Sequence, residues 1–69
     1  MRFDYEELFD IAIREYREAG FLKDGAAGFS QREGLRAWAY ESEECDYEDE
    51  HEVVDEIKRY IKEEKSFES

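Results

Sequence analysis

Carboxylates are the side chains with the most evident chemistry in this chain, and they are concentrated in one stretch. Residues 41–56, here called the acidic segment, hold ten acids among sixteen residues and neither Lys nor Arg. Carboxylates at this density can bind hard cations, transfer protons or attract a positively charged partner. The candidate binding residues are ten carboxylates and one tyrosine: Glu41, Glu43, Glu44, Asp46, Tyr47, Glu48, Asp49, Glu50, Glu52, Asp55 and Glu56.

The acidic segment contains no complete metal-binding motif. An EF-hand loop that began at Asp46 would need Gly at its sixth position and Glu at its twelfth, where the chain has His51 and Ile57. A zinc-protease motif H-E-x-x-H that began at His51 would need a second His where the chain has Asp55, and the chain contains one His. We therefore expect no dedicated metal site and no cofactor.

Nucleophilic catalysis has little support in the sequence. The single cysteine, Cys45, lies among acids, and neighbouring negative charge disfavours the nucleophilic thiolate. We expect Cys45 to be a small, buried or half-buried apolar residue. The chain has no Gly-x-Ser-x-Gly motif and no phosphate-binding loop. These patterns predict a protein that is not an enzyme.

The overall charge excludes some partners. The 69 residues include 21 acids and 10 bases, for a net charge of −11. A protein that binds nucleic acid directly needs a basic surface, and anionic membranes repel an acidic chain. Residues 41–69 hold thirteen acids and four bases, whereas residues 1–40 hold eight and six. The acidity is therefore local, unlike a general adaptation to salt or heat.

Two amphipathic helices are predicted, over residues 4–19 and 47–64, because apolar side chains recur there with helical period. Gly20 suits the left-handed position after the first helix, so that Phe21 can fold back on its last turn. The dipole of a helix that begins near residue 47 favours acids at 46, 48, 49 and 50. It leaves the other acids of the segment unexplained.

The middle of the chain allows two interpretations. Ser30 to Glu33 has the spacing of a helix capping box, and Leu35, Trp38, Ala39 and Ser42 then share one helical side. This gives a mainly α fold, a small domain of about three helices. The alternative is an α+β fold, helix, hairpin, helix, with strands at 28–31 and 35–41. The three-helix fold is favoured because alanines at 37 and 39 suit strands poorly.

A single domain over residues 1–69 is expected, with residues 66–69 as a frayed tail. Tyr16, Trp38, Tyr60 and the phenylalanines should form the core, and a leftover apolar patch would favour dimerisation, with the oligomeric state left open.

No apolar run approaches the roughly 20 residues of a membrane span, no signal peptide is evident, and one cysteine argues against a disulfide framework. We expect a cytoplasmic protein, in the host cytosol if it is phage-encoded.

The acidic segment leads to a functional hypothesis. Carboxylates three or four residues apart on a helix lie about 5–6 Å from one another, close to the spacing of phosphates along a nucleic-acid strand. Exposed Tyr47 and Tyr40 could add contact area. In size, charge and local density of acids the chain resembles small phage-encoded inhibitors that imitate DNA, including anti-CRISPR and anti-restriction proteins. This resemblance covers overall character rather than a motif, and no functional residue is carried over.

The resemblance implies a DNA mimic that inhibits a basic nucleic-acid-binding protein or complex by occupying its binding surface. The runner-up is an acidic antitoxin-like or adaptor protein that regulates one specific partner, through the first helix or the aromatic side chains. A third class is a domain whose acids serve only solubility in an extreme environment.

Overall fold

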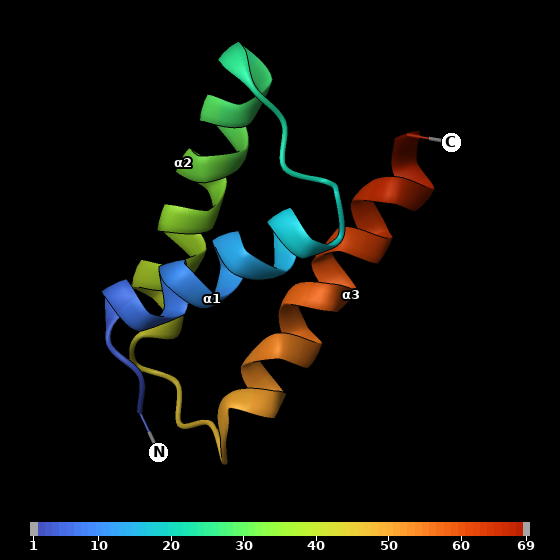
Figure 1. Ribbon diagram of the computed structural model, residues 1–69. Coiled ribbons are helices and arrows are strands. Elements are labelled where there is room, and N and C mark those ends of the chain that lie inside the picture. The colour runs from blue at the N-terminus through green and yellow to red at the C-terminus, as the bar shows by residue number, and fades with distance from the viewer. Residues whose placement is uncertain (1, 69) are drawn as a thin grey trace.

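The computed structural model describes residues 2–68, with side chains through residue 64. The chain forms three helices, α1 (Tyr5–Glu18), α2 (Gly25–Ser42) and α3 (Glu50–Glu68) (Figure 1). No residue in the described part of the chain is in a strand. The mainly α, three-helix prediction is thus confirmed, and the hairpin alternative is wrong.

Both ends of α1 are defined by local hydrogen bonds. At its start, the Asp4 carboxylate accepts a hydrogen bond from the backbone N–H of Glu7 at 2.9 Å, as N-cap residues do. At its end, Gly20 has a φ of 70°, and the N–H of Phe21 donates to the carbonyl of Tyr16 at 2.9 Å. This is the predicted glycine-terminated end, and it places the ring of Phe21 5.5 Å from that of Tyr16.

Helix α2 begins at Gly25, five residues before Ser30, so the predicted capping box is wrong. Ser30 lies inside the helix, whose N-cap is Asp24. The preceding chain is tied to α2 by Gln31, whose amide donates to the Phe21 carbonyl at 3.0 Å and accepts from the Lys23 N–H at 2.7 Å. These tertiary bonds compensate for the glycines in the first turns, which local propensity alone disfavours.

Helix α3 begins at Glu50, three residues later than predicted. Asp49 accepts a hydrogen bond from the N–H of Glu52 at 3.2 Å, and the Glu52 carboxylate accepts from the N–H of Glu48 at 2.6 Å. The two side chains satisfy backbone donors at the helix start, in a variant of the capping box. The backbone of α3 is helical to Glu68, and Ser69 of the predicted tail lies outside the described residues.

The core lies where α1 packs against both other helices (Figure 1). Leu8, Val53 and Ile57 are its largest fully buried side chains. Helices α2 and α3 approach each other through long side chains rather than through close backbone contact. Two aromatic predictions are wrong, because Phe29 is 65 % exposed and Tyr60 is 40 % exposed.

No helix in the described part of the chain has the length and apolar character needed to cross a membrane.

Candidate functional site

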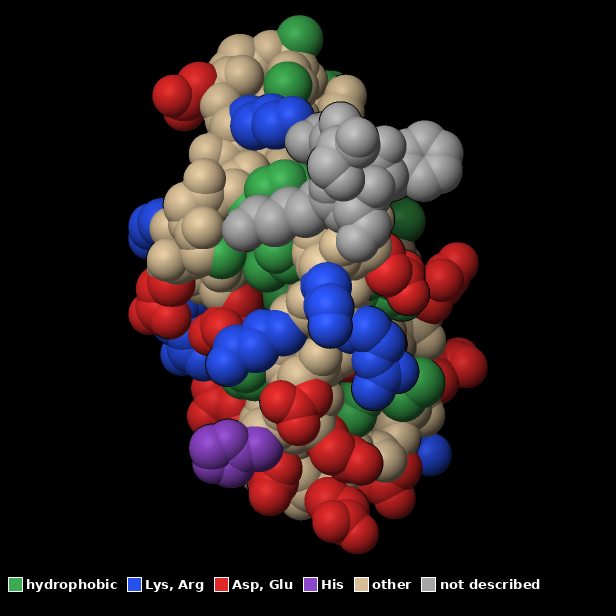
Figure 2. Space-filling model, turned by 90° about the vertical axis from the view of Figure 1, so that its right-hand side faces the viewer, with side chains coloured by type: hydrophobic (Ala, Val, Ile, Leu, Met, Phe, Trp, Pro, Cys, Tyr) green, Lys and Arg blue, Asp and Glu red, His purple; other side chains and the backbone are tan. Residues whose placement is uncertain are grey.

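The acidic segment covers the end of α2, the α2–α3 loop at 43–49 and the first two turns of α3. Figure 2 shows acidic side chains gathered at the lower end of the molecule, where Figure 1 places this loop and the start of α3. We call the exposed carboxylates of the segment the acidic pole: Glu41, Glu43, Glu44, Asp46, Glu48, Asp49, Glu50, Glu52 and Asp55. Nine of the eleven predicted residues therefore face solvent at one end of the protein.

Tyr47 was expected to be exposed, and it is buried. Its ring lies 6.2 Å from that of Phe3, and its hydroxyl donates to Oε2 of Glu56 at 2.8 Å. Burial, together with this bond, raises the pKa of Tyr47 to about 12. Tyr47 therefore anchors the α2–α3 loop to the core. Tyr40 is 64 % exposed, as expected, and stacks on Tyr5 with ring centroids 4.2 Å apart.

Glu56 is also part of the structure rather than of the exposed pole. It is half-buried, and its Oε1 accepts a hydrogen bond from Nε1 of Trp38 at 3.2 Å while its Oε2 accepts from Tyr47. The carboxylate thereby joins α3 to α2 and to the loop. Neither hydrogen bond could be predicted from a run of acids, because Trp38 and Tyr47 are not sequence neighbours of Glu56.

Several pole carboxylates form hydrogen bonds or ion pairs within the protein. Asp49 and Glu52 cap α3, and the Glu43 carboxylate accepts a hydrogen bond from the N–H of Tyr5 at 2.9 Å. Glu50 forms an ion pair with Arg14 at 2.9 Å. Because α3 starts later than predicted, the acids of its first turn are Glu50 and Glu52.

Four pole carboxylates have no such role. The side chains of Glu41, Glu44, Glu48 and Asp55 form no hydrogen bond or ion pair within the described part of the chain. Residues 43–49 are not helical, so the expected phosphate-like helical spacing is wrong for the loop and applies only within α3. The pole offers free charge on a curved surface rather than a straight row.

Cys45 was expected to be at least half-buried, and it is exposed in the same loop as a free thiol. Its neighbours along the chain belong to the acidic pole. Among the described residues no cluster of three or more His, Cys, Asp or Glu side chains is arranged to hold a metal ion.

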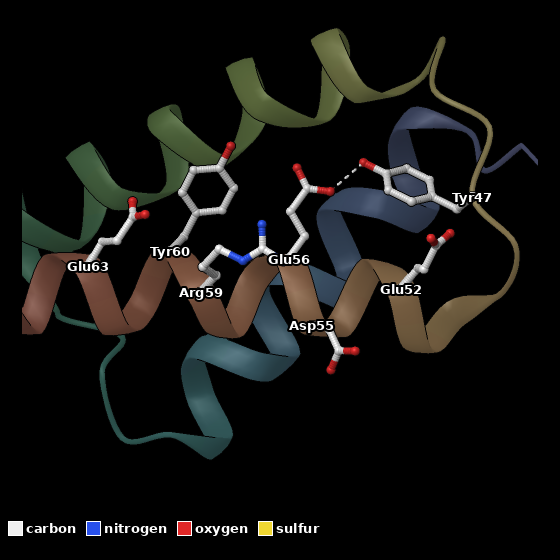
Figure 3. A pocket seen from close by; sticks show the side chains of 7 residues that line it. All are labelled: Tyr47, Glu52, Asp55, Glu56, Arg59, Tyr60 and Glu63. Carbon is white, nitrogen blue, oxygen red and sulfur yellow. Dashed lines mark hydrogen bonds between the residues drawn. The ribbon is translucent and has the colours of Figure 1, made fainter.

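A hollow formed by α3 and the α2–α3 loop was not predicted from the sequence. It has a volume of about 620 Å³ and is lined by Tyr47, Glu52, Asp55, Glu56, Arg59, Tyr60 and Glu63 (Figure 3). Figure 3 shows Glu56 and Tyr60 reaching from α3 toward α2, whereas Asp55 points away. The available signal was the helical spacing of Glu52, Glu56, Tyr60 and Glu63 along one edge of α3.

A second hollow of about 330 Å³ lies beside the first and shares Tyr60 with it. Its lining includes Leu35, Trp38 and Glu41 of α2 and Glu64 of α3. The ring of Tyr60 meets that of Trp38 edge-on, with centroids 6.4 Å apart. We call the two hollows together the α2/α3 groove.

Comparison of the chain with models of protein families, with curated proteins and with solved structures finds no match.

Proposed function

We propose that the protein is a non-enzymatic, cytoplasmic binding protein whose acidic pole occupies a basic nucleic-acid-binding surface of a partner protein. It would act as a nucleic-acid mimic, of the anti-CRISPR or anti-restriction type, that inhibits by competition. The observation that carries the proposal is the set of four exposed carboxylates, Glu41, Glu44, Glu48 and Asp55, with no compensating contact in the described chain.

Uncompensated charge of one sign has a cost in a small domain, because like charges repel one another in the compact state. The same field accelerates association with a partner of opposite charge and orients it. Three exposed bases, Lys58, Arg59 and Lys62, follow the pole along α3. Figure 2 shows basic side chains in a band above the acidic end. The electrostatic field of the protein is therefore directed along α3, with its negative end at the acidic pole.

The pole is also held in place by the fold. Tyr47 anchors the loop from within, Glu43 bonds to the start of α1 and Glu50 pairs with Arg14. A surface that is already ordered loses little conformational entropy on binding. These contacts favour a specific competitor over a charged tail that serves only solubility.

A second candidate function rests on a different face. Phe29 and Tyr40 are 65 % and 64 % exposed, and they stand eleven residues apart on α2, within about 20° of the same helix face. Exposed aromatic side chains are enriched at the centres of protein interfaces. An adaptor or antitoxin-like protein would use this face, and its binding would depend weakly on salt.

Affinity capture with displacement tests the proposal. The immobilised protein is incubated with lysate from the source organism or, where that is a phage, from its host. Bound proteins are eluted with short duplex DNA, with RNA and with salt. We expect elution by nucleic acid and by moderate salt. Two variants, each with a net charge of −5 in place of −11, show which surface of the protein binds the partner.

The pole variant carries Glu44→Lys, Glu48→Lys and Asp55→Lys, and should lose the partner. The α1 variant carries Glu6→Lys, Asp10→Lys and Glu18→Lys, which are exposed acids outside the segment, and should retain most binding. A partner that stays bound in excess nucleic acid, or that both variants lose equally, would refute the proposed function. Loss through Tyr40→Ala with Phe29→Ala would favour the adaptor instead.

A further inference from the structure

We propose that the α2/α3 groove receives an arginine side chain of the partner protein, with the guanidinium against Tyr60 and paired with Glu41, Glu56 and Glu63. The inference rests on the proposed function, because it names the chemistry by which a basic partner is held. The groove shares Glu41, Glu52 and Asp55 with the acidic pole and adds Glu56, Tyr60, Glu63 and Glu64.

The aromatic side of the groove is suited to a planar cation. Tyr60 is 40 % exposed and lies edge-on to Trp38, which is 8 % exposed. The Trp38 indole is held by its hydrogen bond to Glu56, so the Tyr60 ring rests on a fixed support. A guanidinium over such a ring gains about 0.5–1 kcal/mol at an exposed site.

Carboxylates from both helices surround that ring. Burial raises the pKa of Tyr60, the nearby charges of Glu56, Glu63 and Glu41 raise it further, and the nearby cation of Arg59 lowers it. Two of these acids lie on α3 and one lies on α2. An ammonium or guanidinium placed at the Tyr60 hydroxyl would therefore meet negative charge from both walls of the groove.

Glu56 is the best-oriented of these acceptors. Trp38 and Tyr47 hold its two oxygens at 3.2 and 2.8 Å, and each carboxylate oxygen can accept more than one hydrogen bond. Within the described chain no ion pair neutralises Glu56. An incoming guanidinium would find an acceptor whose side-chain conformation is already fixed.

The overall lining favours a charged occupant. The groove contains six carboxylates, Glu41, Glu52, Asp55, Glu56, Glu63 and Glu64, and one guanidinium, that of Arg59. Pockets for neutral metabolites are lined mainly by apolar side chains. The first hollow is lined mainly by charged side chains, whereas the second offers Leu35 and Trp38 beside two carboxylates. Arginine fits better than lysine because its planar, weakly hydrated group stacks on rings and pairs with carboxylates in a bidentate manner.

The fluorescence of Trp38 tests the inference, because Trp38 is the only tryptophan of the chain. The probe is a short Gly/Ser peptide with several arginines, and its counterpart has lysines instead. We expect saturable quenching or a shift of Trp38 emission with the arginine peptide, and several-fold weaker binding of the lysine peptide.

The groove variant, Tyr60→Leu with Glu63→Gln, should bind the arginine peptide about ten-fold more weakly. Its matched control is Tyr40→Leu with Glu33→Gln, the same changes at exposed residues of α2 outside the groove, and should bind normally. Circular dichroism checks that each variant folds. If Tyr60→Leu unfolds the domain, Glu41→Gln with Glu63→Gln, at two exposed positions, carries the test.

Three results would overturn the inference: an unchanged Trp38 emission while the peptide binds, equal losses in the groove variant and its control, or equal affinity for the two peptides. Each leaves the proposed function standing if the captured partner is still displaced by nucleic acid. Conversely, a partner that nucleic acid cannot displace refutes the proposed function, whatever the peptide does.

Discussion

The clearest test of the structure concerns Glu56, the acid that joins α2, α3 and the loop. Glu56→Ala removes the acceptor of the Trp38 indole N–H and of the Tyr47 hydroxyl. Both donors belong to residues that are 8 % exposed, and Glu56 itself is half-buried, so both lose a partner in a place that water reaches only in part.

The expected loss follows from these two bonds. Hydrogen bonds to charged groups contribute about 1.5–3 kcal/mol each in favourable cases, and about 1 kcal/mol is appropriate for partly solvated ones. Glu56→Ala should therefore lower the free energy of unfolding by about 2 kcal/mol. For a domain of this size the core supplies about 3–5 kcal/mol, so the midpoint temperature should fall by about 10 °C.

Urea and thermal unfolding, followed by Trp38 fluorescence and circular dichroism, measure the change. Glu44→Ala is the control, because Glu44 is an exposed acid of the same segment whose side chain forms no hydrogen bond or ion pair with the described residues. Tyr47→Phe alone and combined with Glu56→Ala completes a double-mutant cycle, which should give a coupling of about 1 kcal/mol. A Glu56→Ala protein as stable as Glu44→Ala would refute the reasoning.

Three further outcomes are expected. Gly28→Ala should destabilise the protein by about 2 kcal/mol or more, because an added Cβ would lie 1.9 Å from the Lys23 carbonyl oxygen. Gly34→Ala should stabilise α2 by about 0.5–1 kcal/mol, because an added Cβ would meet nothing within 4 Å. Urea titrations that give both variants the same change in stability would contradict the packing. The pKa of Tyr47 is raised from 10.0 to about 12 on folding. The contribution of the protonated hydroxyl to the free energy of unfolding is therefore complete below pH 10 and is lost as the pH rises toward 12. Unfolding midpoints across that range should fall less steeply in Tyr47→Phe. Cys45 should react fully with a thiol reagent in the folded state because it is exposed, and protection until denaturation would show that the loop is packed differently.

The parts of the fold that local patterns determine could be predicted. Helix α1 was found because its apolar period and Gly20 specify a body and an end without help from distant residues. The start of α2 was missed because its glycines indicate a loop locally, whereas Gln31 and the close packing of Gly28 on the Lys23 carbonyl stabilise a helix there. Such contacts between separate segments are invisible to a pattern.

The candidate site divides in the same way. Exposure of the acids could be predicted, because unpaired charges stay at the surface of small domains. The burial of Tyr47 could not, since it depends on Phe3 and Glu56, which approach it only in the folded chain. The α2/α3 groove was missed for the same reason. The spacing of Tyr60 along α3 suggests a core residue, and only the folded chain shows that its ring lies edge-on against Trp38 of α2.

The position of α1 between the other two helices has a consequence for cooperativity. Because α2 and α3 make no close backbone contact with each other, they form no independent subdomain. A fragment that begins after Gly20 would leave Leu35, Val53 and Ile57 without the apolar surface that covers them. Folding should therefore be all-or-none, and a single proteolytic cut within α1 should unfold the acidic pole and the groove together.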